Sequence, residues 1–371
     1  MPLKIKFYAT NERIDVAIDE IELVDFGGQG QIYKWVYRGN HYLLKIVPRD
    51  DNVFIRLKAI KEAIEDYARK SRIQLPIGIT KRAFPVGGGY VDKPEELGFD
   101  PKERLMIIVY NWIDGERLDN YLRDIRKEPP LSPLRVKLAK RFLDILIILE
   151  KAGVVNYDTF PDNFIVGNDE ELYIIDMEGA GVIDTSTNKW TWLPVALGKD
   201  FPGYCAPPEL QELQKLKQEI QKLKELIKQA RHSEEKSRYE KISGYIEAKE
   251  GMYIPRWLGV QILFEILTGY VPFAFMRRID VEALYKLYRF SDKRRIAWPP
   301  YGSEKLDSNL LNNNLNVQQF RDFIRSNCGS YKDVRPLEKL AFLTFIYGFE
   351  NPSCRPNFEF VKVILGEVLA N

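Results

Sequence analysis

Two aspartates and an asparagine around a short apolar hairpin restrict this chain more than any other feature. Residues 154–180 read VVNYDTFPDNFIVGNDEELYIIDMEGA, in which Asp158 precedes Asn163 and an apolar pair leads into Asp176. Asparagine and aspartate offer the hard oxygen ligands that Mg²⁺ prefers, and Asp158 can accept or orient the proton of an acceptor hydroxyl. The segment therefore predicts a site that holds a nucleotide's metal ions against an acceptor hydroxyl.

A glycine-containing turn lies upstream, between two runs that alternate like strands. Residues 23–47 read LVDFGGQGQIYKWVYRGNHYLLKIV, with the turn GGQG at residues 27–30 and Lys45 inside an apolar run. Glycines let a backbone approach phosphates closely and expose N–H groups to them. A lysine in an apolar run is costly to bury, so the position of Lys45 indicates a specific role for it.

These segments resemble, in order and spacing, the nucleotide-binding hairpin, catalytic loop and metal-binding loop of protein kinases. Three later elements extend the resemblance: GYCAPPEL at 203–210, the apolar run at 257–273 and NPSCRP at 351–356. They are similar to the A-P-E element, the central helix of the large lobe and the late arginine element of that family. In the family the A-P-E glutamate pairs with that arginine, which implies a pair between Glu209 and Arg355.

The resemblance covers roughly residues 20–371 and implies an α+β, bilobal protein-kinase-like fold. A small, mostly antiparallel β lobe would occupy residues 1–113, and a larger helical lobe would occupy residues 114–371. Leucine and isoleucine at heptad spacing predict a helical hairpin inserted at about 210–250. This insertion is either a self-contained decoration of the large lobe or an arm for self-association or partner docking.

The resemblance also implies a role for each candidate site residue, with ATP bound between the lobes. The lysine and the glycine turn would hold phosphates, and the backbone of the linker after residue 110 would contact adenine. The implied catalytic residues are Asp158, Lys45, Asn163 and Asp176, of which Asn163 and Asp176 would bind Mg²⁺ or Mn²⁺. The implied nucleotide-binding residues are Gly27, Gly28, Gln29, Gly30, Ile32, Lys45, Glu65, Tyr110, Asn111 and Ile113.

Hydrophobic periodicity predicts several elements around these motifs. Residues 51–72 form a helix, from which Glu62 or Glu65 would pair with Lys45, and we favour Glu65. Two strands are expected within residues 75–110, separated by a loop at 86–102. A helix should begin after Ser132, which is a good N-cap residue. An extra strand is expected ahead of the glycine turn.

The sequence departs from the kinase pattern at positions that matter for activity. Asn156 stands in place of the catalytic-loop histidine, and Phe160 replaces the lysine that touches the transferred phosphate. Glu178 replaces the glycine after the metal-binding aspartate, where it would approach a second metal or be solvated. Ile254 replaces the aspartate that braces the catalytic loop, so that loop needs another partner.

Two classes of function follow from these motifs. The first is an atypical serine/threonine protein kinase that transfers the γ-phosphate of ATP to a protein hydroxyl. Because of Glu178 and Phe160, a small molecule is the alternative acceptor in this class. The second is a pseudokinase, a scaffold that binds a partner through the 210–250 helical arm.

Composition narrows the setting in which such a protein works. A net charge of +2 gives no electrostatic case for nucleic acid or a membrane surface. No apolar run is long and clean enough to span a bilayer, and the start of the chain lacks the apolar core of a signal peptide. Three scattered cysteines form no metal or disulfide pattern. We therefore expect a cytoplasmic protein. The A-P-E-like and late arginine elements of the resemblance imply a protein substrate.

Overall fold

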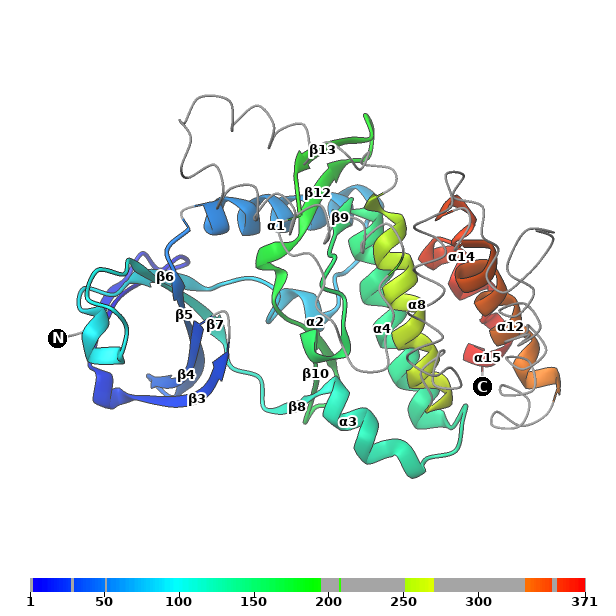
Figure 1. The fold of residues 1–371 in the computed structure, drawn as a ribbon, viewed down its shortest axis with the longest axis horizontal. Helices are drawn as coiled ribbons and strands as arrows, with labels where there is room; N and C mark the ends of the chain where they lie inside the picture. The colour runs from blue at the N-terminus through cyan, green and yellow to red at the C-terminus, as the bar shows by residue number, and fades with distance from the viewer. Residues whose placement is uncertain are drawn as a thin grey trace, which may run out of the picture. The chain divides into compact units, whose positions relative to one another are not determined.

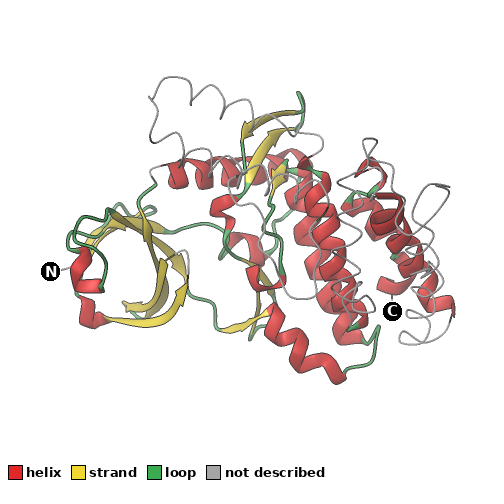
Figure 2. Ribbon diagram, viewed as in Figure 1, coloured by secondary structure: helices red, strands yellow, loops and turns green. Residues whose placement is uncertain are grey.

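The structure is a computed structural model that describes residues 3–27, 30–50, 52–194, 207, 251–269, 331–348 and 352–370. The chain divides into two compact units. The first unit comprises Met1–Glu116 and Phe164–Glu178, and the second comprises Arg117–Asn163 and Gly179–Asn371. A large sheet dominates the described part of the first unit and helices dominate that of the second, so the fold is α+β (Figures 1 and 2).

The first unit is built on a seven-stranded antiparallel sheet that curls on itself (Figure 1). Its strand order is β2-β1-β6-β7-β5-β4-β3. The strands are β1 (Leu3–Phe7), β2 (Arg13–Val16), β3 (Ile21–Gly27), β4 (Gly30–Tyr37), β5 (Asn40–Pro48), β6 (Gly87–Tyr90) and β7 (Leu105–Asn111). The hairpins β3–β4 and β4–β5 follow the alternation that the sequence shows around the glycine turn and Lys45.

Alternating apolar side chains form the core of this sheet. Along β1, Leu3, Ile5 and Phe7 are buried while the lysines between them are exposed. The ring of Phe7 stacks on Trp35 of β4 with 6.0 Å between centroids. One buried face per strand is what a period of two predicts. The strand expected ahead of the glycine turn is thus confirmed, and a second, β2, pairs with it.

Helices and a second, smaller sheet complete the first unit. The longer helix, α1, confirms the helix predicted over 51–72, and its buried face carries the expected Val53, Leu57, Ile60 and Ile64. The helical elements are α1 (Asn52–Ser71), α2 (Ile77–Thr80) and the 3₁₀ turns η1 (Ile18–Glu20), η2 (Pro94–Leu97) and η5 (Met177–Gly179). The small sheet has the order β11-β10-β8 and contains β8 (Gly115–Arg117), β10 (Phe164–Gly167) and β11 (Leu172–Ile174).

Residues 75–110 differ from the sequence-based expectation. The first of the two expected strands is replaced by the short helix α2, and β6 lies inside the segment that was expected to be a loop. Three consecutive glycines argue against a strand by propensity. Here β6 pairs with β1 on one side and β7 on the other, so the ladder hydrogen bonds outweigh the weak propensity of its residues.

Helix α2 packs against β11 through Gly78, where no side chain fits. A Cβ atom on Gly78 would lie 1.7 Å from the carbonyl oxygen of Leu172. We expect Gly78→Ala to push α2 off β11 and lower the free energy of unfolding by about 1–3 kcal/mol in urea denaturation. Gly366→Ala is the matched control, because a Cβ there meets nothing within 4 Å. Equal stability of the two variants would show that α2 does not pack closely on β11.

The described part of the second unit is helical around α4 and α8, with one small sheet. The main helices are α3 (Leu118–Asp124), α4 (Pro133–Lys151), α8 (Tyr253–Thr268), α12 (Tyr331–Ala341), α14 (Phe358–Ile364) and α15 (Gly366–Ala370). The shorter elements are β9 (Val154–Val155), β12 (Gly181–Asp184), β13 (Lys189–Trp192), η3 (Ile125–Lys127), η4 (Pro161–Asn163), the π-helical η6 (Phe342–Tyr347) and η7 (Pro352–Cys354).

Two helices predicted for this unit are present. Helix α4 begins after Ser132, whose Oγ accepts a hydrogen bond from the Arg135 amide at 3.5 Å. Helix α8 is buried along nearly its whole length and begins at Tyr253, ahead of the apolar run expected to form it. Residues 270–273 of that run, the 210–250 insertion and Glu209 lie outside the described residues. Within the described ranges, no helix combines the length and the apolar character needed to cross a bilayer.

Candidate functional site

Lys45 is a buried cation of the first unit, and the candidate site is built around it. It lies on β5, between Ile32 of β4 and Ile108 of β7 in the strand ladder, and it is only 6% exposed. Its ammonium nitrogen lies 2.8 Å from Oδ1 of Asp176 and 3.1 Å from Oε1 of Glu178. A buried ammonium must be paired, and two carboxylates meet that need here.

The end of β11 positions both carboxylates. Strand β11 pairs with β10, and Asp176 follows it with a φ of +57°, a left-handed conformation that aspartate tolerates better than most residues. Met177 is fully buried, which fixes the turn and leaves the acids on either side of it to reach Lys45. The turn after β11 thus brings Asp176 to Lys45, a contact that was not predicted from the sequence.

Glu178 is held by three different elements of the first unit. The hydroxyl of Tyr110, at the end of β7, donates to Oε1 of Glu178 at 2.7 Å. Arg56 of α1 donates to the carbonyl oxygen of Glu178 at 2.9 Å. Together with the Lys45 contact, these bonds fix both the backbone and the side chain of Glu178. The residue is thus a junction between β5, β7 and α1.

The charges of this cluster set the protonation of its members. Burial by itself lowers the pKa of Lys45, but the charges of Glu178 and Asp176 and their hydrogen bonds outweigh it and raise the pKa above its usual 10.5. A raised pKa means that the pairing stabilises the fold below pH 10.5 and is lost only as the pH rises through the folded-state value. Burial, and then the charge of Glu178, raise the pKa of Tyr110, so its hydroxyl stays a donor.

The expected pairing of Lys45 with Glu65 does not occur. Glu65 lies 3.7 Å from Lys61, and Glu62 lies 3.7 Å from Lys58, with the side chains of both pairs more than half exposed. The buried face of α1 passes through residues 53, 57, 60 and 64, and both glutamates lie outside that stripe. Glu178 instead takes the carboxylate role at Lys45, which differs from both the metal-bound and the solvated alternatives considered for it.

Two matched substitutions separate these roles. Glu178→Gln removes a charge that is hydrogen-bonded to Lys45 and Tyr110, so we expect urea denaturation to give a free energy of unfolding lower by about 1.5–3 kcal/mol. Glu65→Gln removes one half of an exposed helix pair, so we expect a change of at most about 0.5 kcal/mol. The reverse ranking would restore Glu65 as the partner of Lys45.

The glycine turn and the linker are also described, in part. Gly27 and Gly30 pair across the turn, while Gly28 and Gln29 lie outside the described residues. Gly30 has a φ of +143°, and a Cβ on it would lie 2.1 Å from the carbonyl oxygen of Ile46, so only glycine fits this position.

The expected adenine contacts of the linker stay predictions. Asn111 donates its side-chain amide to the carbonyl oxygen of Lys81 at 2.9 Å, and Ile113 is 7% exposed. These contacts fix the linker to the segment that follows α2. The backbone groups proposed to read adenine therefore belong to a braced part of the chain.

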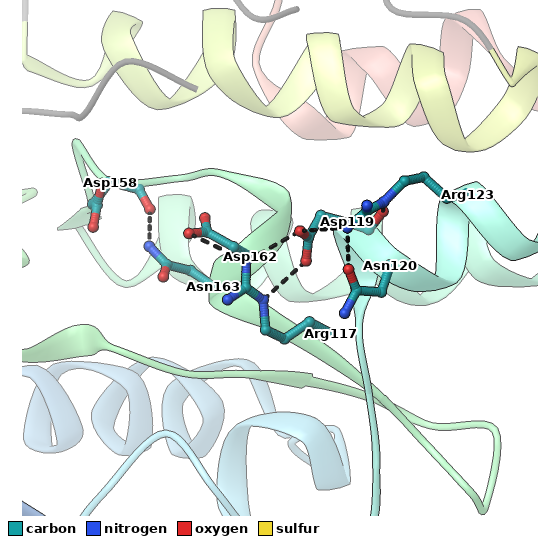
Figure 3. Close-up of polar contacts among 7 residues, drawn as sticks. All are labelled: Arg117, Asp119, Asn120, Arg123, Asp158, Asp162 and Asn163. Carbon is teal, nitrogen blue, oxygen red and sulfur yellow. Dashed lines mark hydrogen bonds and ion pairs between the residues drawn. The ribbon is translucent and has the colours of Figure 1, made fainter. Parts of the chain in front are cut away.

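In the second unit, the catalytic-loop segment is braced by its own asparagines, of which Figure 3 draws Asn163. Asn163 donates its side-chain amide to the carbonyl oxygen of Asp158 at 2.5 Å. The side-chain oxygen of Asn156 accepts from the amide of Asp158 at 3.0 Å, and the hydroxyl of Thr159 donates to the carbonyl oxygen of Asn156 at 2.8 Å. These bonds supply support of the kind that Ile254 cannot give. They also assign a function to Asn156, the residue that departs from the kinase histidine.

A second set of charges surrounds the other aspartate of this loop. Arg117 donates to both carboxylate oxygens of Asp119 at 3.0 Å and lies 3.9 Å from Asp162 (Figure 3). Arg123 lies on the far side of Asp119, at 3.6 Å. This network ties the loop to the beginning of α3, so Asp162 has a structural environment different from that of Asp158.

Oxygen donors are the available ligands for the metal that the resemblance implies. In the described ranges, no group of three or more His, Cys, Asp or Glu side chains is arranged to hold a metal ion. In the first unit, the side chain of Asp176 is 38% exposed and offers a carboxylate oxygen. Mg²⁺ keeps several waters and takes one or two protein oxygens when phosphates complete its shell, so this carboxylate fits a metal that arrives with a nucleotide. Asn163 belongs to the second unit and stays a predicted ligand.

Several residues of the cluster around Lys45 were not singled out from the sequence. Arg56 had a usable signal, because it lies three residues after Val53 and four before Ile60, on the apolar stripe of α1. Arg82 had no such signal, since it stands in an irregular segment between α2 and β6.

In the second unit, the buried Arg355, which was expected to pair with Glu209, donates to the carbonyl oxygens of Gly348 and Tyr253 at 2.9 and 3.0 Å.

Comparisons with known proteins add no family to these observations. No protein-family model matches the sequence, and a search of curated proteins returns no match.

Proposed function

We propose that the protein is an ATP-dependent phosphotransferase with a bilobal kinase-like fold, an atypical serine/threonine protein kinase that phosphorylates a protein hydroxyl. One observation carries the proposal. A lysine buried in a strand pairs at 2.8 Å with an aspartate 131 residues later, in the turn that follows another strand. Burying a lysine is costly, and pairing it with an acid that is 38% exposed leaves a polar group that phosphates and metal can reach.

Each residue of the proposed site has a role in transfer. Lys45 binds the α- and β-phosphates, and Asp176 and Asn163 hold the metal, which neutralises charge on the phosphates when bound. Asp158 orients the acceptor hydroxyl and takes its proton as the oxygen forms a bond to the γ-phosphorus. The bond from that phosphorus to the bridging oxygen breaks, and ADP leaves.

In this site Glu178 pairs with Lys45, the role that the resemblance gave to a glutamate of helix α1. Its carboxylate is bonded to Lys45 and Tyr110, and its backbone is bonded to Arg56. The lysine is therefore oriented by the turn that also carries Asp176. The proposed enzyme needs no movement of Glu62 or Glu65 toward Lys45 in order to be competent.

Calorimetric titration with MgATP tests the nucleotide part of the proposal. We expect saturable binding of MgATP, and weaker binding of ATP when EDTA removes the metal, because two carboxylates next to Lys45 repel an uncomplexed polyphosphate. Glu65→Gln serves as the control and should leave the affinity unchanged. A folded wild-type protein that binds no nucleotide under either condition would exclude the proposal.

A pseudokinase is the second candidate, and two observations favour it. The Lys45 ammonium is already engaged by two carboxylates, and Phe160, at the position of the phosphate-contacting lysine, is 1% exposed. Nucleotide binding without transfer or hydrolysis would support this function. Label from ATP on added protein would support the protein kinase, whereas label only on small hydroxyl compounds would move the acceptor to that class.

A further inference from the structure

Arg82 is a buried cation for which the catalytic scheme above has no use. It is 5% exposed and follows α2 in the first unit. Its position is fixed from both sides along the chain. The amide of Ala83 donates to the carbonyl oxygen of Ile79 at 3.2 Å, and the carbonyl oxygen of Lys81 accepts from the side chain of Asn111 at 2.9 Å.

The packing of α2 on β11 gives Arg82 its surroundings. Because Gly78 allows α2 to touch the backbone of β11, the residue that follows α2 comes close to the acids that follow β11. The Arg82 guanidinium carbon lies 4.4 Å from the centroid of the Tyr110 ring. The charges of Asp176 and Glu178 also act on it. Arg82 therefore belongs to the same cluster as Lys45.

The guanidinium lacks the hydrogen bonds that a buried arginine normally makes. Within the described ranges its contacts are the Tyr110 ring and the charges of the two acids, and no residue there accepts a hydrogen bond from it. A guanidinium carries five N–H donors, and no Arg82 nitrogen is among the fully enclosed side-chain atoms that lack a hydrogen-bond partner. The donors are therefore open to water, or to a ligand that supplies acceptor oxygens in its place.

The charge of the cluster indicates what that ligand is. Lys45 alone faces Asp176 and Glu178, so these three groups carry one positive and two negative charges. Arg82 adds a second positive charge, which balances the two acids, and the charge of Arg56 is opposed by that of Asp50. Arg82 is thus a cation whose donors are open, so its ligand is an anion, and planar guanidinium is the side chain best matched to phosphate oxygens.

We propose that Arg82 is a second phosphate-binding cation of this site, and that its guanidinium donates to oxygens of the same polyphosphate chain that Lys45 binds. The proposal rests on the proposed function, for which it supplies the positive charge that Phe160 does not. Tyr110 orients the guanidinium by stacking, and its hydroxyl holds the Glu178 carboxylate.

Calorimetry on Arg82→Gln tests the proposal with three probes: MgATP, magnesium tripolyphosphate and adenosine. We expect the affinities for MgATP and tripolyphosphate to fall at least about 10-fold, since a charged hydrogen bond is lost, while the affinity for adenosine stays the same. Arg104→Gln is the matched control, because Arg104 is exposed in the same unit and should change none of the three. Unchanged polyphosphate affinity in Arg82→Gln would overturn the assignment.

Stability separates a binding role from a structural one. If Arg82 serves a ligand, then Arg82→Gln removes a buried charge without hydrogen bonds, and the urea midpoint of the nucleotide-free protein should stay the same or rise. If Arg82 serves the fold, the midpoint should fall. Arg82→Lys keeps the charge and loses the fork of donors, so it should recover only part of the polyphosphate affinity. Full recovery by lysine, or a large fall in the midpoint, would contradict the proposal.

The same experiment distinguishes failure of this assignment from failure of the proposed function. Wild-type binding of tripolyphosphate that depends on Arg82, without binding or transfer from MgATP, would keep the anion site and exclude the phosphotransferase. MgATP binding that depends on Lys45 and not on Arg82 would keep the phosphotransferase and exclude this role for Arg82.

Discussion

Asp158→Asn should abolish most phosphate transfer, lowering kcat by about 10³-fold, while the Kd for MgATP stays within about twofold of wild type. Asparagine has nearly the same size as aspartate but cannot take a proton from the acceptor hydroxyl. The main-chain contacts of this residue, with the side chains of Asn156 and Asn163, do not involve the carboxylate and should persist. Steady-state kinetics for kcat and calorimetry for Kd check the two halves of the expectation.

Asp162→Asn is the control for this experiment. Asp162 lies four residues further along the same loop, and its carboxylate lies 3.9 Å from Arg117 (Figure 3). Asparagine keeps the size of the side chain, and Arg117 is 47% exposed and stays paired with Asp119, so the variant should fold and keep kcat within about threefold of wild type. Equal losses in both variants would show that the loop needs its negative charge for folding and that Asp158 has no specific role.

Lys45→Met should lose both nucleotide affinity and stability. The substitution leaves Asp176 and Glu178 without their cation, and removing one partner of a buried pair costs about 3–5 kcal/mol. Because Asp176 is 38% exposed and water can reach it, we expect about 2–3 kcal/mol in urea denaturation. The affinity for MgATP should fall about 10- to 100-fold with the loss of a charged contact to phosphate.

Two further lysine variants serve as controls for Lys45→Met. Lys61→Met replaces an exposed lysine of α1 and should change neither stability nor affinity by a measurable amount. Lys45→Arg keeps the charge at β5, so it should recover part of the stability if the paired carboxylates are the reason for the loss. An affinity for MgATP that survives in Lys45→Met would remove Lys45 from the nucleotide site.

The elements that periodicity encodes were predictable from the sequence. The helix over 51–72 has its apolar stripe, the helix after Ser132 has its N-cap, and the strands around the glycine turn have their alternation, so local pattern and structure agree. Local sequence determined these features because each depends on residues a few positions apart.

The remaining features depend on contacts that no local pattern encodes. Glu178 replaces Glu65 at Lys45 because the turn after β11 reaches β5, and both helix glutamates fall outside the buried stripe of α1. Strand β6 exists because β1 and β7 pair with it, against the propensity of its glycines. Arg82 enters the cluster because α2 packs on β11, a contact that depends on the missing side chain of Gly78.

Transfer of the labelled γ-phosphate of ATP, with Mg²⁺ or Mn²⁺, tests the central claim most directly when wild type is compared with Asp158→Asn at saturating nucleotide. Label on protein, label on small hydroxyl compounds and free phosphate are scored separately. We expect wild type to transfer label to a protein hydroxyl and the variant to bind nucleotide without transferring it. A folded wild-type protein that produces neither labelled product nor free phosphate would contradict the assignment of a phosphotransferase.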